Sequence, residues 1–507
     1  MSERKVRVRF APSPTGPLHI GGVRTALYNY LFAKHHGGDF LLRIEDTDQT
    51  RFVPGAEEYI IESLKWLGLE PDEGLGYGGD NGPYRQSERK PMYMSYAKQL
   101  LENGHAYYAF DTPEELTEVR ERAKQAKVAS WQYNNITRNS MRNSLTMPAD
   151  EVQAKLDAGE PHVIRFKMPR GEEIRFEDAI RGWVVFSSDQ LDDKVLMKND
   201  GMPTYHLANI VDDHLMNITH VIRGEEWLPS APLHIMLYKG FGWEAPTFAH
   251  LSLILKPNGK GKLSKRDGDE GGFPVFPINW KDPATGNTLL GYRESGYYPE
   301  AVLNLLAFLG WNPGTTQEIF SLDELVQAFS LERVGKSGAK FDPEKAKWYN
   351  QQYLRTRSDE QLIDELNPML KEEGLEPSQD TLMKSVGLLK ERAFFAKDML
   401  EGRFFFEAPK EYDEKLASKK WKEETPAILS ELKDKLVVLD SFTAAPLEAS
   451  FKEFLEEKEL GMGAVMPNLR LAITGKGVGP AFFDTLEIIG KDEFASRIEA
   501  ACESMPV

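Results

Sequence analysis

Two segments that are far apart in the sequence contain residues able to bind and activate a triphosphate. The first, residues 9–22, ends in a histidine and two glycines, His19, Gly21 and Gly22. The second is a glycine-rich, charged stretch that starts near residue 256 and contains Lys262, Ser264 and Lys265. Lysines and a histidine can bond phosphate oxygens, and glycines let a ligand approach the backbone closely. Together these residues predict a triphosphate site, in which His19 could stabilise charge as it develops on a phosphoryl oxygen.

Each segment has a simpler interpretation when it is taken alone. A lone histidine is more often a packing residue, and a run of charges is more often a solvated surface. The presence of both segments in one chain favours the nucleotide site.

The first segment is predicted to join a β-strand to an α-helix. Before it, Val6, Val8 and Phe10 alternate with arginines, which is the pattern of a half-buried strand. After it, apolar residues recur at helical spacing up to the pair Gly37 and Gly38. Open α/β sheets bind ligands at the carboxyl ends of their strands, and helix N-termini attract phosphate. We therefore expect the first amides of this helix to face a phosphate group.

Two further strand candidates end in charged residues. Residues 40–44 are followed by Glu45, and residues 219–222 are followed by Arg223. Because the carboxyl ends of parallel strands meet at one edge of a sheet, Arg9, Glu45 and Arg223 are expected to face one crevice.

An insertion is predicted between the two halves of this α/β pattern. Residues 112–115 have the spacing of a helix capping box, and residues 163–166, 174–176 and 183–186 are strand candidates separated by turns. The α/β alternation resumes at residues 195–198. It is followed by an expected helix in which two polar residues share one face, Tyr205 and Asn209.

The remainder of the chain is predicted to be almost wholly helical from residue 299 onwards. Before it, residues 268–295 form a segment rich in glycine and proline to which we assign no function. The fold class is multidomain α/β plus α, and the expected domain ranges are 1–107, 108–190, 191–255, 256–322, 323–385 and 386–507.

Two clusters of acidic residues partly match metal-binding patterns, but neither meets the requirements of a metal site. Asp46, Asp48 and Glu57 fall on a calcium-loop template, but Arg51 occupies the position that requires glycine. The consecutive residues 212–214, Asp-Asp-His, do not share a helical face, so a hydrogen-bonding role is favoured.

Composition limits the classes of protein. The 507 residues carry a net charge of −17, which opposes non-specific binding to nucleic acid. The single cysteine, Cys502, excludes an internal disulfide framework, and no apolar run is long enough to span a bilayer. We expect a cytoplasmic protein in which RNA binds only at local basic patches. The candidates are Arg120, Arg122, Lys124, Lys127, Arg138, Arg142, Lys336, Lys340, Lys345 and Lys347.

Several motifs resemble those of one enzyme family. The two phosphate-binding segments resemble the paired signatures of class I aminoacyl-tRNA synthetases, with Gly22 where the generic first signature often has a second histidine. Residues 11–16 (Ala-Pro-Ser-Pro-Thr-Gly), 43–48 (Arg-Ile-Glu-Asp-Thr-Asp) and 82–89 (Gly-Pro-Tyr-Arg-Gln-Ser-Glu-Arg) are similar to those of bacterial glutamyl-tRNA synthetases. This resemblance covers nearly the whole chain.

The resemblance implies a fold and a set of partners. The α/β part would be a doubly wound, Rossmann-like catalytic domain, the α+β insertion would hold the tRNA acceptor end, and the all-α C-terminal region would read the anticodon, with Arg392 and Arg470 facing its bases. ATP with Mg²⁺, L-glutamate and tRNA(Glu) would be the substrates of a monomeric ligase. His19, Lys262 and Lys265 would be its catalytic residues, and the ATP site would also include Gly21, Gly22 and Ser264. Many family members have a cysteine-rich zinc site in the insertion; this region has no cysteine, so we predict no metal in the protein.

The resemblance also implies a glutamate site with matching charges. Glutamate brings two carboxylates and one ammonium, and the two arginines with Glu45 supply the complementary set. Ser13 and Glu45 would hold the ammonium, and Arg9 with Tyr205 is favoured for the side-chain carboxylate, although the sequence does not settle which arginine takes it. The whole expected set is Arg9, Ala11, Ser13, Glu45, Tyr205, Asn209 and Arg223. Structural ion pairs of the arginines with Asp46 or Glu225 are the alternative.

Four other functions share some of these features. Glutaminyl-tRNA synthetases usually carry β-barrels where this chain is expected to be helical, and a truncated relative that modifies a tRNA base would lack that half. A small-molecule nucleotidylyltransferase would need neither the insertion nor the helical region. A non-catalytic RNA-binding module is disfavoured because both phosphate-binding segments are intact.

Overall fold

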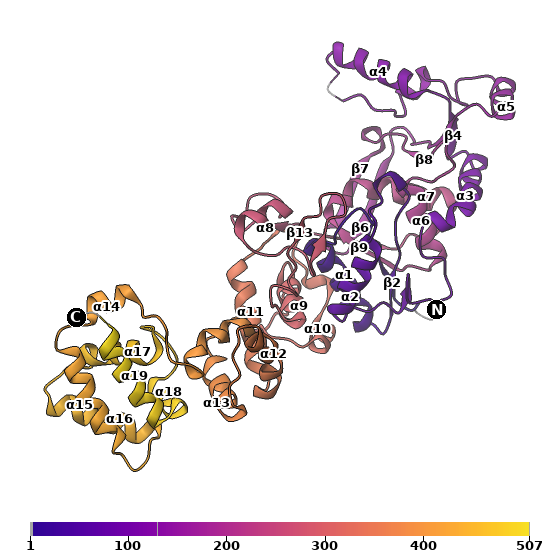
Figure 1. Ribbon diagram of the computed structural model, residues 1–507. Helices are drawn as coiled ribbons and strands as arrows, with labels where there is room; N and C mark the ends of the chain where they lie inside the picture. Colours follow the sequence, from indigo (N-terminus) through magenta and orange to yellow (C-terminus); the bar gives the residue numbers. More distant parts are fainter. Residues whose placement is uncertain (1–3, 129, 506–507) are drawn as a thin grey trace. The chain divides into compact units, whose positions relative to one another are not determined.

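The computed structural model describes residues 4–128 and 130–505 (Figure 1). The chain divides into two units: an N-terminal unit that reaches Ser295 and includes Pro299–Ala346, and a C-terminal unit of Gly296–Tyr298 and Lys347–Val507. Each unit has its own hydrophobic core.

The N-terminal unit is built on two parallel groups of strands. The first sheet has the order β1, β2, β3, formed by Arg7–Phe10, Asp39–Leu42 and Glu73–Gly74. The second has the order β7, β6, β10, β9, formed by Gly182–Ser187, Glu173–Asp178, Thr247–Leu251 and His220–Gly224. In the second sheet β9, β10 and β6 are parallel, and only β7 is antiparallel to its neighbour.

The two sheets meet at β1 and β9. The backbone amide of Thr219 donates to the carbonyl of Arg7 at 2.9 Å, and the Arg7 amide donates to the Thr219 hydroxyl at 2.9 Å. Strand order therefore runs outward in opposite directions from this junction, which makes it the switch point of a doubly wound sheet. Ligands bind at such points beyond the carboxyl ends of the strands, where Phe10 and Gly224 lie.

Helix α1 starts directly at the first phosphate-binding segment. It spans Ile20–His35, and Gly37 follows it with a φ of 60°, the left-handed conformation that commonly ends helices. Figure 1 places α1 against the strands of this unit, where Val23, Leu27 and Leu31 are fully buried. The predicted strand, turn and helix are confirmed. The other helices around the sheet are α2 (Ala56–Trp66), α3 (Lys90–Glu102), α6 (Tyr205–Leu215) and α7 (Ala231–Phe241).

The inserted region has a small antiparallel sheet of its own. Its strands are β4, β5 and β8, formed by Ala106–Ala109, Val163–Phe166 and Val195–Met197. Its helices are α4 (Pro113–Gln125), which begins with the predicted capping box, and α5 (Ala149–Asp157).

Three strands belong to a different sheet from the one that we expected. The predicted strands at residues 174–176 and 183–186 exist as β6 and β7, but β6 pairs with β10 of the central sheet and β7 pairs with β6, so both belong to that sheet and not to the sheet of the insertion. Conversely, β8, which we expected to resume the α/β pattern, is antiparallel to β5. Local patterns reveal a strand but not its partner, and the domain boundaries drawn from them stay predictions.

The segment after β10 contains short elements. These are β11 (Ile254–Leu255), α8 (Lys265–Gly271), β12 (Trp280–Lys281), β13 (Thr288–Leu289), α9 (Pro299–Phe308), α10 (Leu322–Ala328) and β14 (Ala339–Lys340). The glycine- and proline-rich segment packs on α2: the Tyr59 hydroxyl donates to the Ile278 carbonyl at 2.6 Å, and Trp280 contacts the Tyr59 ring edge-on.

The C-terminal unit is helical, as predicted. The division between the units falls within α11 (Pro343–Thr356). Leu432, Phe451, Leu469 and Phe494 are fully buried in its core. The helices that follow α11 are α12 (Asp359–Glu372), α13 (Gln379–Leu389), α14 (Glu414–Lys420), α15 (Thr425–Val437), α16 (Ala444–Glu457), α17 (Met462–Thr474), α18 (Phe482–Ile489) and α19 (Lys491–Ser504).

Candidate active site

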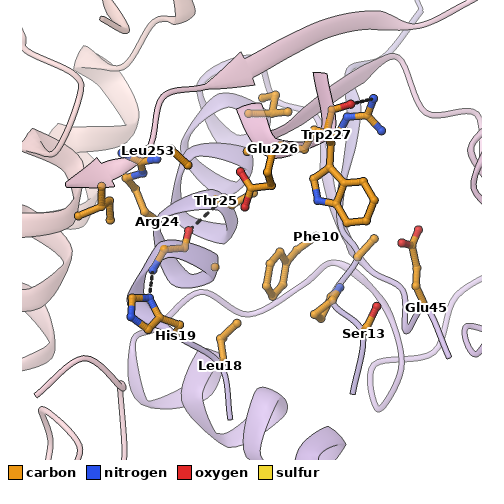
Figure 2. Close-up of a pocket in the computed structure, with 18 of the residues that line it drawn as sticks. Phe10, Ser13, Leu18, His19, Arg24, Thr25, Glu45, Glu226, Trp227 and Leu253 are labelled. Atoms are coloured by element: carbon orange, nitrogen blue, oxygen red, sulfur yellow. Dashed lines mark hydrogen bonds between the residues drawn. The ribbon is translucent and has the colours of Figure 1, made fainter. Parts of the chain in front are cut away.

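A pocket of about 370 Å³ opens at the carboxyl ends of β1 and β9. Eleven of the residues predicted for nucleotide or glutamate line it: Arg9, Ala11, Ser13, His19, Gly21, Gly22, Glu45, Tyr205, Asn209, Arg223 and Lys262. Figure 2 shows His19 at one end of the pocket, Glu45 and Ser13 at the other, and Phe10 between them. Of the predicted set, Ser264 and Lys265 do not line the pocket; they lie where α8 begins.

Arg9 is buried and already has an anionic partner. Its Nε donates to Asp213 Oδ1 at 3.0 Å, and Arg43 Nη1 lies 2.8 Å from the same oxygen. Burial opposes ionisation of Asp213, but the two arginines outweigh it and hold the pKa of its carboxyl below the ordinary value. The ion-pair partner of Arg9 is thus Asp213 and not Asp46, and Arg181, not Arg223, pairs with Glu225.

Glu45 supplies a buried negative charge to the pocket, which Glu226 also lines. Its Oε1 accepts from Asn209 Nδ2 at 2.8 Å and from Arg43 Nη2 at 3.0 Å. Burial raises the pKa of Glu45, although Arg43 and Arg9 oppose this rise. A ligand ammonium bound here would therefore stabilise the ionised form of the Glu45 carboxylate, which burial disfavours.

Arg223 is buried among neutral groups. Its Nη1 donates to the Tyr205 hydroxyl at 3.0 Å, and its Nη2 donates to the Trp227 carbonyl at 3.4 Å. Tyr205 is thus hydrogen-bonded to Arg223, and the assignment of the side-chain carboxylate to Arg9 with Tyr205 stays a prediction.

His19 is held in one orientation. Its Nδ1 accepts from the Gly21 amide at 3.1 Å, so the ring proton lies on Nε2, which is buried without a hydrogen-bond partner among the described residues. Burial, assisted by Lys262, lowers the pKa of His19 to about 4. The side chain is thus a neutral donor whose free N–H can meet a phosphate oxygen.

The expected free amides at the start of α1 are not available. The amides of Ile20, Gly21 and Gly22 donate, respectively, to the Val275 carbonyl at 3.0 Å, to His19 Nδ1 at 3.1 Å and to the His19 carbonyl at 2.8 Å. Our prediction that they face a phosphate is therefore wrong for this state of the protein. Gly22 also has a packing role, because a Cβ there would lie 2.6 Å from Leu18 Cδ1.

The lysine loop, residues 256–266, is largely exposed apart from the buried Leu263 and is held by surface ion pairs. Lys262 Nζ lies 3.1 Å from Glu226 Oε1, and Lys256 Nζ lies 2.8 Å from Asp267 Oδ1. The Ser264 amide donates to Asp267 Oδ2 at 2.9 Å, so Ser264 caps α8. Lys265, the next residue, is exposed.

Comparison with known proteins identifies the family. Residues 5–348 match the family model for the catalytic domain of class I tRNA synthetases (E and Q), and residues 361–502 match an anticodon binding domain. The glutamate–tRNA ligase of Cytophaga hutchinsonii is 59% identical over 99% of this chain and 98% of its own length. That of Phocaeicola vulgatus is 58% identical over 99% of both. The chain belongs to the glutamate–tRNA ligases.

A solved structure of the same family agrees in fold. The crystal structure of a glutamate tRNA ligase from Elizabethkingia meningosepticum, in complex with its amino acid, has a TM-score of 0.94 and 56% identity and covers 99% of this chain and 100% of that one. The predicted family, fold class and ligase activity are confirmed, and membership of class I implies the use of ATP.

The two arginines predicted to read the anticodon hold one loop of the C-terminal unit. Arg392 Nη1 donates to the Gly479 carbonyl at 2.9 Å, and Arg470 Nη1 donates to the Pro480 carbonyl at 3.0 Å. The Arg470 guanidinium also lies 5.0 Å from the centroid of the Phe482 ring. Their contact with anticodon bases stays a prediction.

One candidate for RNA binding is excluded by its position. Arg138 is buried and lies 3.0 Å from Asp193, so it is part of the core of the insertion. Arg142 is paired with Glu115 and Glu160, whereas the arginines and lysines of α4 are exposed.

Several residues of the site were not identified from the sequence. Asp213 was noted only as part of a polar triplet, and His234 and His250, which contact Arg223, lie in apolar surroundings that gave no signal. Trp227, which packs on Tyr205 with ring centroids 4.5 Å apart, follows Arg223 closely and was assigned no role from the sequence.

The acidic triplet at residues 212–214 has structural partners. Asp212 accepts from Gln86, Arg89 and Tyr93, Asp213 pairs with Arg9 and Arg43, and His214 stacks on Trp243. Over residues 4–128 and 130–505, no group of three or more His, Cys, Asp or Glu side chains is placed to hold a metal ion. The absence of zinc stays a prediction.

The described helices include none with the length and apolar content that crossing a membrane requires.

Proposed function

We propose that this pocket activates L-glutamate with ATP and passes the glutamyl group to tRNA(Glu), with the named side chains in the following roles. The observation that carries the proposal is the convergence of two buried arginines, a buried glutamate and a neutral histidine donor in one pocket at the switch point of the sheet. The charges match a ligand with two carboxylates and one ammonium at one end and phosphate at the other.

Arg223 and Tyr205 bind the side-chain carboxylate of glutamate. Support comes from their mutual hydrogen bond and from the lack of any ion pair to Arg223 within the described residues, which leaves the charge free for a ligand. Glu45 and Ser13 bind the ammonium. Arg9 shares Asp213 with Arg43 and orients the α-carboxylate toward the His19 end.

His19 and the lysine loop bind the phosphates. In the first step an α-carboxylate oxygen attacks the α-phosphorus of ATP, and pyrophosphate leaves. His19 Nε2–H donates to a phosphoryl oxygen as charge develops, and Lys262 and Lys265 approach the leaving group when Lys262 releases Glu226. Ser264 and the turn at Gly21 and Gly22 complete the ATP site, and the Mg²⁺ that accompanies ATP neutralises part of the triphosphate charge.

In the second step a terminal hydroxyl of tRNA attacks the carbonyl carbon of glutamyl-adenylate, AMP leaves and the hydroxyl proton is released. Arg392 and Arg470 would identify the tRNA through its anticodon.

We also propose that the enzyme acts as a monomer in the cytoplasm. It contains no zinc, and metal analysis of the purified protein that finds stoichiometric zinc would contradict this.

Aminoacylation with purified tRNA(Glu) and tRNA(Gln), each with glutamate and with glutamine, tests the proposal. We expect glutamate to be attached in the presence of ATP and glutamine to be rejected. A preference for glutamine would overturn the amino-acid assignment, and adenylate formation that ignores every tRNA would favour a small-molecule nucleotidylyltransferase.

A further inference from the structure

Arg223 is held by a chain of buried groups that the reaction itself does not use. A guanidinium has five N–H donors and no acceptor, so each partner must offer a lone pair. Besides Tyr205 and Trp227, these partners are two histidines, His250 on β10 and His234 on α7, both fully buried.

The first arm runs from Asp178 through His250. Asp178 Oδ2 lies 2.6 Å from His250 Nδ1, and Arg223 Nε donates to His250 Nε2 at 3.1 Å. The ring can satisfy both contacts only with its proton on Nδ1 and its lone pair on Nε2. Asp178 is itself fixed, because its Oδ1 accepts from the amides of Ile180 and Arg181 in the turn after β6.

The second arm runs through His234. Arg223 Nη1 lies 3.3 Å from His234 Nδ1, and His234 Nε2 lies 3.2 Å from His206 Nδ1. Arg223 requires a lone pair on His234 Nδ1, so the proton of His234 lies on Nε2 and is donated to His206. Burial, followed by the charge of Arg223, lowers the pKa of His234 well below its ordinary value, which agrees with a neutral ring.

We infer that His250, oriented by Asp178, and His234 are positioning residues that fix the Arg223 guanidinium while leaving its charge without an anionic partner. A carboxylate at either place would orient the arginine equally well but would pair with its charge, as Asp213 pairs with Arg9. Neutral imidazoles orient the guanidinium without pairing with its charge. The positive charge of Arg223 in this buried site is thus kept for the substrate carboxylate. This inference rests on the proposed role of Arg223 in glutamate binding.

A matched pair of variants tests it: His234→Asn and His234→Asp have nearly the same shape and differ in charge. Asn offers Arg223 a neutral acceptor, and Asp gives it an anion. We expect KM and Kd for glutamate to be at least about tenfold higher in His234→Asp than in His234→Asn, because a charge-assisted bond to the ligand is lost. KM for ATP should stay within about twofold in both. Equal glutamate constants in the two folded variants would overturn the inference.

A second pair keeps the test decisive if His234→Asp does not fold. His250→Gln retains an acceptor for Arg223, whereas His250→Phe removes it, so only the second should raise KM for glutamate by about tenfold. Equal losses in both would contradict a positioning role. His220→Gln, on the same strand as Arg223 but bonded to Thr219, is the control and should match wild type.

Arg223→Gln separates this inference from the function on which it rests. If that variant binds glutamate as wild type does, the role of Arg223 is wrong and the positioning role falls with it. If Arg223→Gln no longer binds glutamate while His234→Asn and His234→Asp have equal Kd for glutamate, only the positioning role of the histidines is contradicted. Direct titration of glutamate by calorimetry gives Kd without turnover, and thermal unfolding checks each fold.

Discussion

The two ends of the pocket differ in how completely they are assembled. At the amino-acid end, Arg9, Glu45 and Arg223 are almost fully buried and each is held by at least two groups or by a buried ion pair. At the phosphate end, Lys262 has 58% of its side chain exposed and its partner Glu226 has 46%, and Lys265 stays outside the lining.

This difference suggests different sources of selectivity and rate. Preorganised charges discriminate strongly because no binding energy is spent on arranging them. Lys262 must leave Glu226 when ATP arrives, so ATP binding includes a conformational step. Substitutions at the amino-acid end should therefore change selectivity most, and those at the phosphate end should change the rate of the chemical step.

The largest effect is expected for Arg223→Ala. A buried arginine that faces the neutral amide of glutamine loses its charge-assisted bonds, which corresponds to a discrimination of roughly 10³. Arg223→Ala should lose most of kcat/KM for glutamate and narrow the gap to glutamine, whereas Arg9→Ala should weaken both amino acids more evenly. The measurement is the ratio of kcat/KM for the two amino acids at saturating ATP and tRNA. A collapse of the ratio in Arg9→Ala alone would exchange the roles of the arginines.

Asp213→Asn should destabilise the N-terminal unit by about 3 kcal/mol, because it leaves Arg9 and Arg43 buried without their shared anion. Guanidinium chloride unfolding followed by tryptophan fluorescence gives the free energy of unfolding. A loss below about 1 kcal/mol would show that the buried network at the amino-acid end is not the rigid part of the pocket.

His19→Ala should slow adenylate formation by roughly a hundredfold while KM for glutamate changes little. Lys265→Ala should have a similar effect on rate although Lys265 does not line the pocket now, because the loop must close for the chemical step. Single-turnover measurement of adenylate formation, with the fold checked by circular dichroism, tests both. Near-normal rates would remove the substituted residue from the reaction.

Glu226→Gln should have a much smaller effect on stability. Its ion pair with Lys262 is exposed, so the free energy of unfolding should change by less than about 0.5 kcal/mol. Release of Lys262 should leave KM for ATP unchanged or lower it. A large rise in KM for ATP would mean that Glu226 contacts the nucleotide directly.

The smallest effect concerns acid stability. The pKa of His19 is about 4 in the folded protein against an ordinary value of 6.5, so between these values the unfolded chain binds the extra proton. The contribution of His19 to stability is therefore complete above pH 6.5 and is lost as the pH falls toward 4. His19→Gln should show a shallower decline of unfolding free energy over this window. Equal slopes in wild type and variant would contradict the lowered pKa.

Strand ends and signature residues could be predicted from the sequence because their information is local. The alternation before Arg9 fixed the carboxyl end of β1, and the same logic gave Glu45 and Arg223 as neighbours at one edge. The pairing of β6 with β10 depends on residues about 70 positions apart, as Phe248 and Asp178 show, and no local pattern carries it.

The environment of each charge could not be predicted for the same reason. Asp213 contacts Arg9 although the two residues are 204 positions apart in the sequence, and Asp178 contacts His250 across 72 positions. The sequence therefore indicated which residues form the site. It did not indicate which arginine already has an anionic partner, and this difference is the basis of the separate roles that we propose for Arg9 and Arg223.

The occupied amides at the start of α1 have a consequence for the by-products of the reaction. Backbone N–H groups without acceptors at a helix N-terminus would bind inorganic phosphate or pyrophosphate tightly. Cellular phosphate would then compete with ATP for this site. Here Val275 and His19 take up the first three amides. We therefore expect weak product inhibition by pyrophosphate and little sensitivity of the reaction rate to phosphate buffer. The anion must be bound by the long side chains of the lysine loop, which release it when the loop opens.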